Sequence, residues 1–252
     1  MSSENVGFHS NLTEGDTANF IGENIVTGYG NHTVIHDVSV ESRDGVTCIF
    51  GPNGSGKSTL INTLNGSVPT WSGTIRFGDE DLTDLAPYEI VEHGIVTLPQ
   101  DGGLFPSLTV EENLKVGGHS LADSDVVAAR IEDVYDSMPL LKEKQDAKAG
   151  SLSGGQQMLL SFGRATILDA DIYLLDEPSA GLSPALVDDL IEMVEQLVAN
   201  GSQVVLVEQN VEAALRIADY IYILAQGELK FEGTPEELSE KDRLLDVYLG
   251  IE

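Results

Sequence analysis

The chain contains a single cysteine and no long apolar run. Cys48 alone excludes an internal disulfide, and its place in the apolar run 46–50 indicates a buried small hydrophobe rather than a reactive thiol. No apolar run approaches the roughly 20 residues that a membrane-spanning helix requires. Residues 1–19 are polar and lack the basic-then-apolar pattern of an export signal. We therefore expect a folded chain that has neither a membrane span nor a signal peptide.

Basic residues are scarce, since 13 Lys and Arg stand against 42 Asp and Glu, for a formal net charge of −29. Binding to nucleic acid depends on basic contacts to phosphate, so this composition argues against a nucleic-acid partner, and it also disfavours anionic lipid surfaces. Two interpretations remain: an unusually acidic cytosolic protein, or a protein adapted to a salt-rich cytoplasm, as in halophilic archaea. At molar salt the Debye length falls to roughly 3 Å, which screens the self-repulsion of such a surface. We adopt the halophilic origin as a hypothesis.

The order of the hydrophobic patterns predicts an α/β fold. Strand-like runs at 25–27, 33–40 and 46–50 precede the first helical segment at 58–64. Residues 101–150 then carry helical patterns, and strands alternate with helices again after residue 151. This alternation is typical of a mainly parallel sheet that is covered on both faces, and the early strands indicate an additional antiparallel part.

The length of 252 residues suits one large domain with a lobe. We expect a variable polar tail over residues 1–20 and one domain over residues 21–252. A helical lobe, about 101–158, is inserted into the α/β core. Near the end of the chain, Thr234 and Pro235 predict the start of a helix, with Thr as N-cap and Pro at the first helical position.

Residues 51–59 match the pattern Gly-x4-Gly-Lys-Ser/Thr of a phosphate-binding loop, between an apolar strand and a helix-compatible segment. The glycines let backbone N–H groups converge on phosphates, and the following helix adds the positive end of its dipole. In this pattern Lys57 reaches the β- and γ-phosphates and Ser58 holds Mg²⁺. The alternative is a Gly-rich turn with a solvated lysine. The predicted nucleotide-binding residues are Gly51, Pro52, Asn53, Gly54, Ser55, Gly56, Lys57, Ser58 and Thr59.

A second apolar run, 172–175, ends in two acids, Asp176 and Glu177. In a parallel sheet the carboxyl end of this strand lies beside the phosphate loop. Asp176 would hold Mg²⁺ directly or through water, and Glu177 would polarise the attacking water as a general base. The alternative interpretation is an acidic turn at a strand end.

Between these motifs lies the run Leu-Ser-Gly-Gly-Gln at 152–156, which matches the signature of ATP-binding cassette (ABC) ATPases. The chain resembles this family from about residue 21 onward, in the order of its motifs as well. The resemblance implies an ABC-type nucleotide-binding domain that works as a head-to-tail dimer. ATP would lie between the phosphate loop of one copy and the signature of the other, although a plain loop and helix cap is the alternative for the signature run alone. The ATP contacts would come from Ser153, Gly154, Gly155 and Gln156.

The resemblance assigns roles to further positions. Tyr29 lies 28 residues before Lys57, where the family stacks an aromatic ring on adenine, and a plain strand-end tyrosine is the alternative. Gln100 matches the glutamine that senses Mg²⁺ and the attacking water, so it counts among both the catalytic and the metal-binding candidates. Residues 179–184 match the loop that crosses the dimer interface. Gln209 occupies the switch position of the catalytic site.

Gln209 departs from the family, because most members have histidine there. A neutral amide can hydrogen-bond the γ-phosphate but cannot become a cation or relay a proton. Either Glu177 carries most of the base chemistry, or hydrolysis is slow. The run Val-Glu-Gln-Asn at 207–210 resembles the ATPases of branched-chain amino acid importers and of their urea or amide-uptake relatives, as does the run 109–114. That branch often has Pro-Glu-Gly where this chain has Pro-Gln-Asp-Gly at 99–102.

The resemblance therefore implies an ATP- and Mg²⁺-dependent subunit at the cytoplasmic face of the cell membrane. It would hydrolyse ATP and power an importer through separate membrane-spanning permease subunits. A second ATPase subunit, identical or related, would complete the dimer. Two alternatives remain, namely a soluble ABC ATPase outside transport, such as an iron–sulfur assembly component, and a nucleic-acid-associated cassette. The net charge of −29 argues against the last of these.

Overall fold

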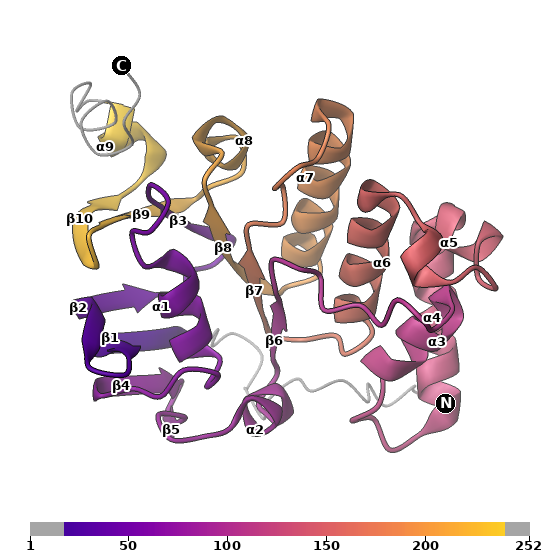
Figure 1. Ribbon diagram of the computed structural model, residues 1–252, viewed down its shortest axis with the longest axis horizontal. Coiled ribbons are helices and arrows are strands. Elements are labelled where there is room, and N and C mark those ends of the chain that lie inside the picture. Colours follow the sequence, from indigo (N-terminus) through magenta and orange to yellow (C-terminus); the bar gives the residue numbers. More distant parts are fainter. Residues whose placement is uncertain (1–17, 240–252) are drawn as a thin grey trace.

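The computed structural model describes residues 18–239, which form two β-sheets and a set of helices (Figure 1). Of the tail that we predict over residues 1–20, residues 1–17 lie outside the described part of the chain. Phe20 already begins the first strand.

A four-stranded antiparallel sheet carries the early strands of the chain. Its strand order is β2-β1-β4-β5, and β1 pairs with both β2 and β4. A tight turn at Gly30, whose φ of 61° lies in the left-handed region, joins β1 to β2. This sheet is the antiparallel part that the sequence predicts. Its strands are β1 (Phe20–Tyr29), β2 (His32–Glu41), β4 (Ser72–Phe77) and β5 (Glu80–Asp81).

A six-stranded sheet forms the centre of the molecule, in the order β10-β9-β3-β8-β7-β6. All neighbouring pairs are parallel except β9 and β10. Every residue of β3, β7 and β8 is buried, which explains their continuous apolar runs, because both faces of a parallel sheet are covered. The strands are β3 (Val46–Phe50), β6 (Ile95–Leu98), β7 (Ile172–Asp176), β8 (Gln203–Glu208), β9 (Tyr220–Ala225) and β10 (Glu228–Gly233).

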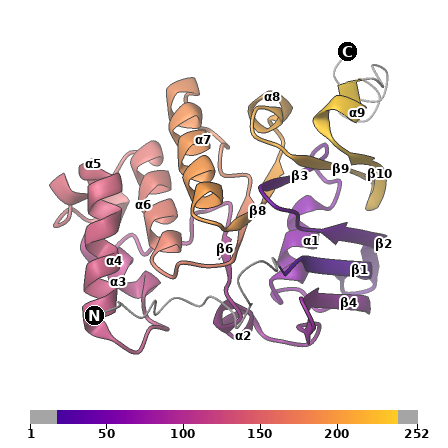
Figure 2. The same ribbon diagram turned by 180° about the vertical axis from the view of Figure 1, so that it is seen from behind.

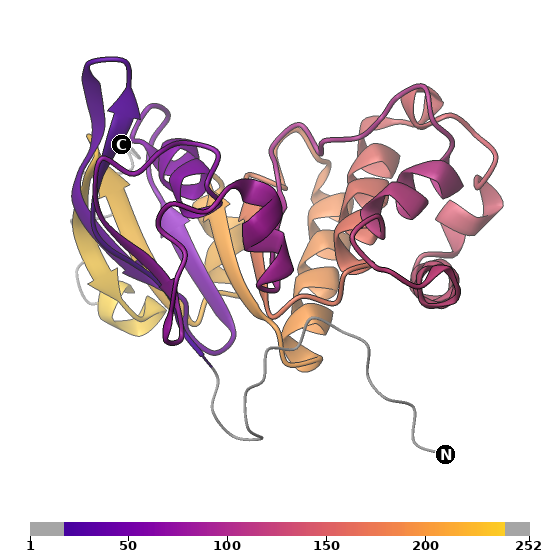
Figure 3. The ribbon, with the colours of Figure 1, turned by 90° about the horizontal axis from the view of Figure 1, so that it is seen from below.

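Several of the helices lie apart from the antiparallel strands. Helices α3 to α6 gather at the end of the molecule that is remote from the four-stranded sheet, and α7 lies between them and the strands (Figures 1 and 2). Seen from below, the antiparallel strands and the helical group form two diverging arms (Figure 3). The helices are α1 (Lys57–Leu64), α2 (Pro87–Glu92), α3 (Val110–Gly117), α4 (Ser124–Ser137), α5 (Pro139–Glu143), the short η1 (Ala149–Ser151), α6 (Gly154–Thr166), α7 (Pro184–Ala199), α8 (Val211–Leu215) and α9 (Pro235–Ser239).

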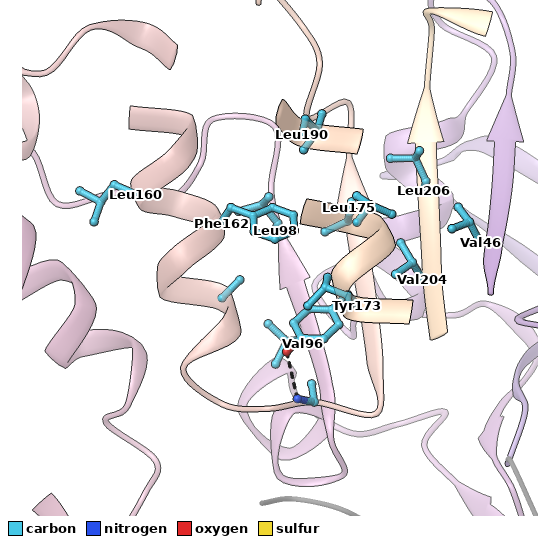
Figure 4. Close-up of a cluster of buried hydrophobic side chains, with 14 of the residues drawn as sticks. Val46, Val96, Leu98, Leu160, Phe162, Tyr173, Leu175, Leu190, Val204 and Leu206 are labelled. Carbon is cyan, nitrogen blue, oxygen red and sulfur yellow. Dashed lines mark hydrogen bonds between the residues drawn. The ribbon is translucent and has the colours of Figure 1, made fainter. Parts of the chain in front are cut away.

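Two apolar clusters hold these layers together. One joins the six-stranded sheet to the helical group and includes Leu98, Phe162 and Leu175 (Figure 4). Within it the Tyr173 hydroxyl accepts a hydrogen bond of 3.1 Å from the backbone N–H of Ala170, so its polar end is satisfied. The other cluster lies between the two sheets and α1. Each fully buried aliphatic or aromatic side chain contributes roughly 1.5–3 kcal/mol to folding.

The predicted α/β fold, with its parallel core, antiparallel sheet and helical group, is confirmed. The helix start at Thr234 is also confirmed, since its Oγ1 accepts from the N–H of Glu237 at 3.3 Å. Strand β10 is an element that the pattern analysis does not contain. Its sequence, Glu-Leu-Lys-Phe-Glu-Gly, carries charges because it lies at the edge of its sheet, and this hides the strand signal.

Candidate functional site

The phosphate loop connects β3 to α1. Gly54 and Gly56 have φ values of 77° and 107°, in the left-handed region that favours glycine. A Cβ on Gly51 would meet the backbone oxygen of Leu224 at 2.2 Å, so only glycine fits there, whereas a Cβ on Gly54 would face open space. The Lys57 side chain folds back into the loop and donates to the Gly51 carbonyl at 2.8 Å. The loop is thus built from backbone that can approach a ligand closely.

Two neighbouring strand ends, those of β7 and β6, lie beside this loop. Ser58 Oγ lies 3.2 Å from Asp176 Oδ1 at the end of β7. The next residue, Glu177, pairs with Lys57 at 3.2 Å and accepts a hydrogen bond of 3.1 Å from the Gln100 side chain, which follows β6. Functional groups gather here because the carboxyl ends of parallel strands share one edge of the sheet.

Burial sets the electrostatics of this cluster. The pKa of Asp176 is raised, chiefly by desolvation and also by the nearby Glu177 charge, while the Ser58 hydrogen bond and Lys57 oppose the shift. Lys57 and Glu177 are themselves almost completely buried, with exposed side-chain fractions of 4% and 11%. A buried ion pair of this kind is weak evidence for stability, because desolvation offsets the attraction. The arrangement is better explained as one that holds charged groups ready for a ligand.

A pocket of about 260 Å³ opens over the loop. Its lining fits a magnesium nucleotide, because the buried Lys57 cation and the Ser58 hydroxyl line it beside the open space at Gly54. Residues 18–239 contain no group of three or more His, Cys, Asp or Glu side chains arranged to hold a metal ion. Mg²⁺ does not require one, since it typically takes one or two protein ligands and completes its shell with phosphate and water. The pocket is lined by Val34, Asn53, Gly54, Gly56, Lys57, Ser58, Thr59, Gln100 and Glu177.

Comparison with known proteins decides the family. The family described as ABC transporter matches residues 35–180. The chain belongs to the ABC transporter family. The chain is therefore an ABC ATP-binding domain, and the family's ATPase subunits bind and hydrolyse ATP.

Individual relatives cover nearly the whole ABC ATPase. The high-affinity branched-chain amino acid transport ATP-binding protein BraG of Pseudomonas aeruginosa is 40% identical, over 90% of this chain and 98% of its own length. The probable branched-chain amino acid transport ATP-binding protein LivF of Archaeoglobus fulgidus is 36% identical, over 89% and 95% of the two chains. A crystal structure of a nucleotide-free ATP-binding cassette from an ABC transporter superposes with a TM-score of 0.83 at 30% identity, covering 93% of this chain and 99% of that one.

The structure does not bring all predicted site residues of the ABC ATPase together. The signature begins helix α6, where Ser153 and Gln156 form a capping box: the Gln156 N–H donates to Ser153 Oγ at 3.4 Å, and Gln156 Oε1 accepts from the Ser153 N–H at 3.1 Å. None of residues 153–156 lines the pocket over the phosphate loop. Tyr29, with an exposed fraction of 53%, and the exposed Gln209 also lie outside its wall.

The pattern analysis misses three residues that shape the site of this ABC ATPase. Val34 of β2 forms part of the pocket wall. Arg164 of α6 donates to the Gly102 carbonyl at 3.1 Å and to the Gly103 carbonyl, which ties the signature helix to the loop after Gln100. Glu208, at the end of β8, is a buried acid that follows an apolar strand, as Asp176 does. That repetition was the one signal that could have identified Glu208.

Proposed function

We propose that this chain is the ATP-hydrolysing subunit of an ABC importer for branched-chain amino acids or related small solutes. The observation that carries the proposal is the convergence of Lys57, Ser58 and Glu177 in one pocket over the phosphate loop. The solute class rests on the relatives in Pseudomonas aeruginosa and Archaeoglobus fulgidus, whose names state branched-chain amino acid transport.

Each group around the pocket has a part in phosphoryl transfer to water. Backbone N–H groups of the loop and Lys57 hold the β- and γ-phosphates and offset their negative charge. Ser58 and Asp176 would hold Mg²⁺, which would neutralise charge that develops on the phosphate oxygens. Glu177 accepts a proton as the water oxygen bonds to the γ-phosphorus, and the bond to the bridging oxygen breaks to leave ADP. Gln100, which hydrogen-bonds Glu177, orients both that carboxylate and the water.

Residues outside the pocket would act across a dimer. Within one chain the signature residues lie off the pocket, and a Cβ on Gly154 would face open space. In the proposed head-to-tail dimer, residues 153–156 contact the γ-phosphate held by the second subunit. Tyr29 would stack on adenine, and Gln209 would donate to the γ-phosphate.

The distribution of acids supports a site composed of both segments. No Asp or Glu occurs between Asp44 and Asp79, which includes the phosphate loop, or between Asp146 and Asp169, which includes the signature. Such segments are unexpected in a chain with 42 acids. Acids within either segment would repel the phosphates of ATP, and Asp176 and Glu177, which do lie beside the loop, face Ser58 and Lys57. The lack of acids within the segments fits two surfaces that share one nucleotide.

The proposal also implies where the chain lies in the cell and which subunits it binds. No helix within residues 18–239 has the length and apolar character to cross a bilayer. The ATPase would dock from the cytoplasmic side onto separate membrane-spanning permease subunits. Its partner would be a second ATPase subunit, either identical or related. We propose a domain over residues 21–252 with the helical lobe at about 101–158, and we retain the halophilic origin as a proposal.

Two measurements test the function. Lys57→Ala should lower ATP hydrolysis by about 10²–10³-fold, because it removes the cation that stabilises the transferred phosphoryl group. Lys142→Ala, which removes an exposed surface cation, is the matched control and should retain wild-type turnover. Wild-type turnover in Lys57→Ala would refute the site. For the transport role, a tagged chain should co-purify with multi-span permeases from native membranes. Recovery with soluble iron–sulfur assembly proteins instead would favour an ABC ATPase outside transport.

A further inference from the structure

Glu208 is a buried carboxylate that the proposed hydrolytic steps do not use. It is the last residue of β8, and only 2% of it is exposed. In the described part of the chain, no lysine, arginine or histidine forms an ion pair with it. A buried acid without a cation is costly, so its environment must satisfy it in another way.

Backbone N–H groups from two separate loops satisfy this carboxylate. Glu208 Oε1 accepts from the N–H of Ser179 at 2.9 Å, in the loop that follows Glu177. Glu208 Oε2 accepts from the N–H of Gln209 at 3.2 Å and from that of Asn210 at 3.4 Å, in the loop that follows β8. One side chain thus links the loop of the proposed general base to the loop of the switch glutamine.

The remaining surroundings of Glu208 are apolar. Val187 and Leu190 of α7, together with Ala214 of α8, line the same small cavity. Desolvation raises the pKa of Glu208, while the hydrogen bonds from Ser179, Asn210 and Gln209 oppose that shift. Water cannot readily replace these bonds in an apolar setting, so the two loops depend on the carboxylate.

The loop after β7 has a backbone that needs such support. Glu177 has a φ of 47°, in the left-handed region that is uncommon for residues other than glycine. Strained conformations persist where surrounding contacts over-determine them. The Glu177 N–H donates to the Val207 carbonyl at 2.9 Å and fixes the start of the turn. The bond from Ser179 to Glu208, two residues later, fixes its end.

We propose that Glu208 is a positioning residue that aims Glu177 and Gln209 together at the γ-phosphate, through the backbone N–H groups of Ser179 and Gln209. This inference rests on the roles proposed above for Glu177 and Gln209. Because the carboxylate bonds both loops, a shift of one loop changes the position of the other. Glu208 would therefore affect the rate of hydrolysis without contacting ATP.

The first test replaces the carboxylate by its amide. Glu208→Gln keeps the shape of the side chain but turns one acceptor into an NH₂ group, which faces backbone N–H donors. We expect kcat of the full chain to fall about tenfold and KM for Mg-ATP to change less than about twofold, because geometry is lost and phosphate binding is kept. Gln203→Ala is the control: Gln203 is also buried, at the other end of β8, where its Oε1 accepts from Ser42 Oγ and its Nε2 donates to the Ala18 carbonyl at 3.3 Å. The kcat of Gln203→Ala should stay at the wild-type value even if its Tm falls by as much as the Tm of Glu208→Gln.

A local readout separates positioning from general destabilisation. In Glu208→Gln, amide hydrogen exchange should rise in peptides that cover residues 177–182 and 207–211 and stay unchanged elsewhere, whereas Gln203→Ala should leave both peptides unchanged. A uniform rise across the chain, or equal loss of kcat in both variants, would overturn the proposal. If Glu208→Gln does not fold, Glu208→Asp provides the same comparison, since it keeps the charge but shortens the reach to Ser179.

A mutant cycle tests whether Glu208 acts through Glu177 and Gln209. In a background that carries both Glu177→Gln and Gln209→Ala, Glu208→Gln should lower the residual single-turnover rate by less than about twofold, because both groups it positions are already lost. Independent, multiplying losses would overturn the proposal. Failure of the function itself would look different, since wild-type chain and Lys57→Ala would then show the same ATP turnover.

Discussion

Two helix N-termini of this molecule carry the phosphate loop and the signature run, which we propose to recognise phosphate, and they differ in what surrounds them. At the start of α1, Lys57 and Ser58 find their partners within the chain, at Glu177 and Asp176. At the start of α6, the side chains of Ser153 and Gln156 each accept a hydrogen bond from the other's backbone N–H, in the capping box. The first terminus therefore belongs to a cluster of charged and polar side chains, whereas the second is capped by its own side chains.

The difference shows how one fold can present half of a site for another subunit to complete. Helix α1 lies against the buried carboxyl edge of the parallel sheet, so sheet geometry places the acids beside it. The N-terminus of α6 lies near Gln100 and Glu177, since Gly154 lines a second pocket with them, but none of residues 153–156 lines the pocket over the phosphate loop. The N-terminal N–H groups of α6 are thus available to an anion that does not belong to this chain's own pocket.

The largest effect on ATP turnover should come from the groups beside the start of α1. Glu177→Gln removes the base but keeps the size of the side chain, so ATP should bind while turnover falls by about 10²–10⁴-fold. An ATP-bound dimer should then accumulate, as measured by size-exclusion chromatography with and without Mg-ATP. Glu132→Gln, on an exposed face of α4, is the control. Turnover at the wild-type rate would remove Glu177 as the base.

Variants of two adjacent glycines at the start of α6 test the role of the signature. A Cβ on Gly154 meets nothing within 4 Å, so Gly154→Ala should keep Tm within about 2 °C of wild type. If the partner's nucleotide docks there, turnover should nevertheless fall about tenfold or more, because the added methyl separates the helix start from the phosphate.

Gly155 provides the contrast to Gly154. A Cβ on Gly155 would lie 2.3 Å from Cδ1 of the half-buried Leu186, which must move, so Gly155→Ala should be less stable than Gly154→Ala, by about 1 kcal/mol. Urea unfolding and ATPase assays of both variants would show the difference. Unchanged turnover in Gly154→Ala would mean that the signature does not complete a site.

A smaller effect is expected where the chain departs from its family. Gln209→His should leave turnover unchanged or raise it by up to about fivefold, because either side chain can donate to the γ-phosphate and the imidazole can also carry charge. Gln209→Ala should reduce turnover, since it removes the donor. Steady-state ATPase rates of the three proteins decide this. Complete loss in Gln209→His would instead show that the amide has a role that histidine cannot fill.

Sequence reasoning reaches the residues whose chemistry is local. The phosphate loop is recognisable because its glycines, lysine and serine act within one short segment, and the structure places Gln100, Asp176 and Glu177 beside it. Arg164 could not be found in this way, because it bonds to a carbonyl 62 residues earlier and only the packing of α6 brings them together. The contacts of Glu208 could not be found from sequence for the same reason, since its partner Ser179 lies 29 residues earlier, in the loop after the neighbouring strand β7.

The smallest effect that we predict concerns the surface around both halves. With a formal net charge of −29, surface carboxylates should repel one another and destabilise the folded state at low ionic strength. The two segments without acids do not contribute to this repulsion. Raising KCl from about 0.1 M to about 1 M shortens the Debye length from roughly 10 Å to roughly 3 Å. We expect Tm to rise by about 5 °C or more, which is a change of about 2 kcal/mol for a chain of this size. Sorbitol at equal osmolality is the control, because it is excluded from the surface but screens no charge. A Tm and an ATPase rate that stay at their high-salt values in dilute buffer would contradict the halophilic origin, because the acids would then carry no cost that salt relieves.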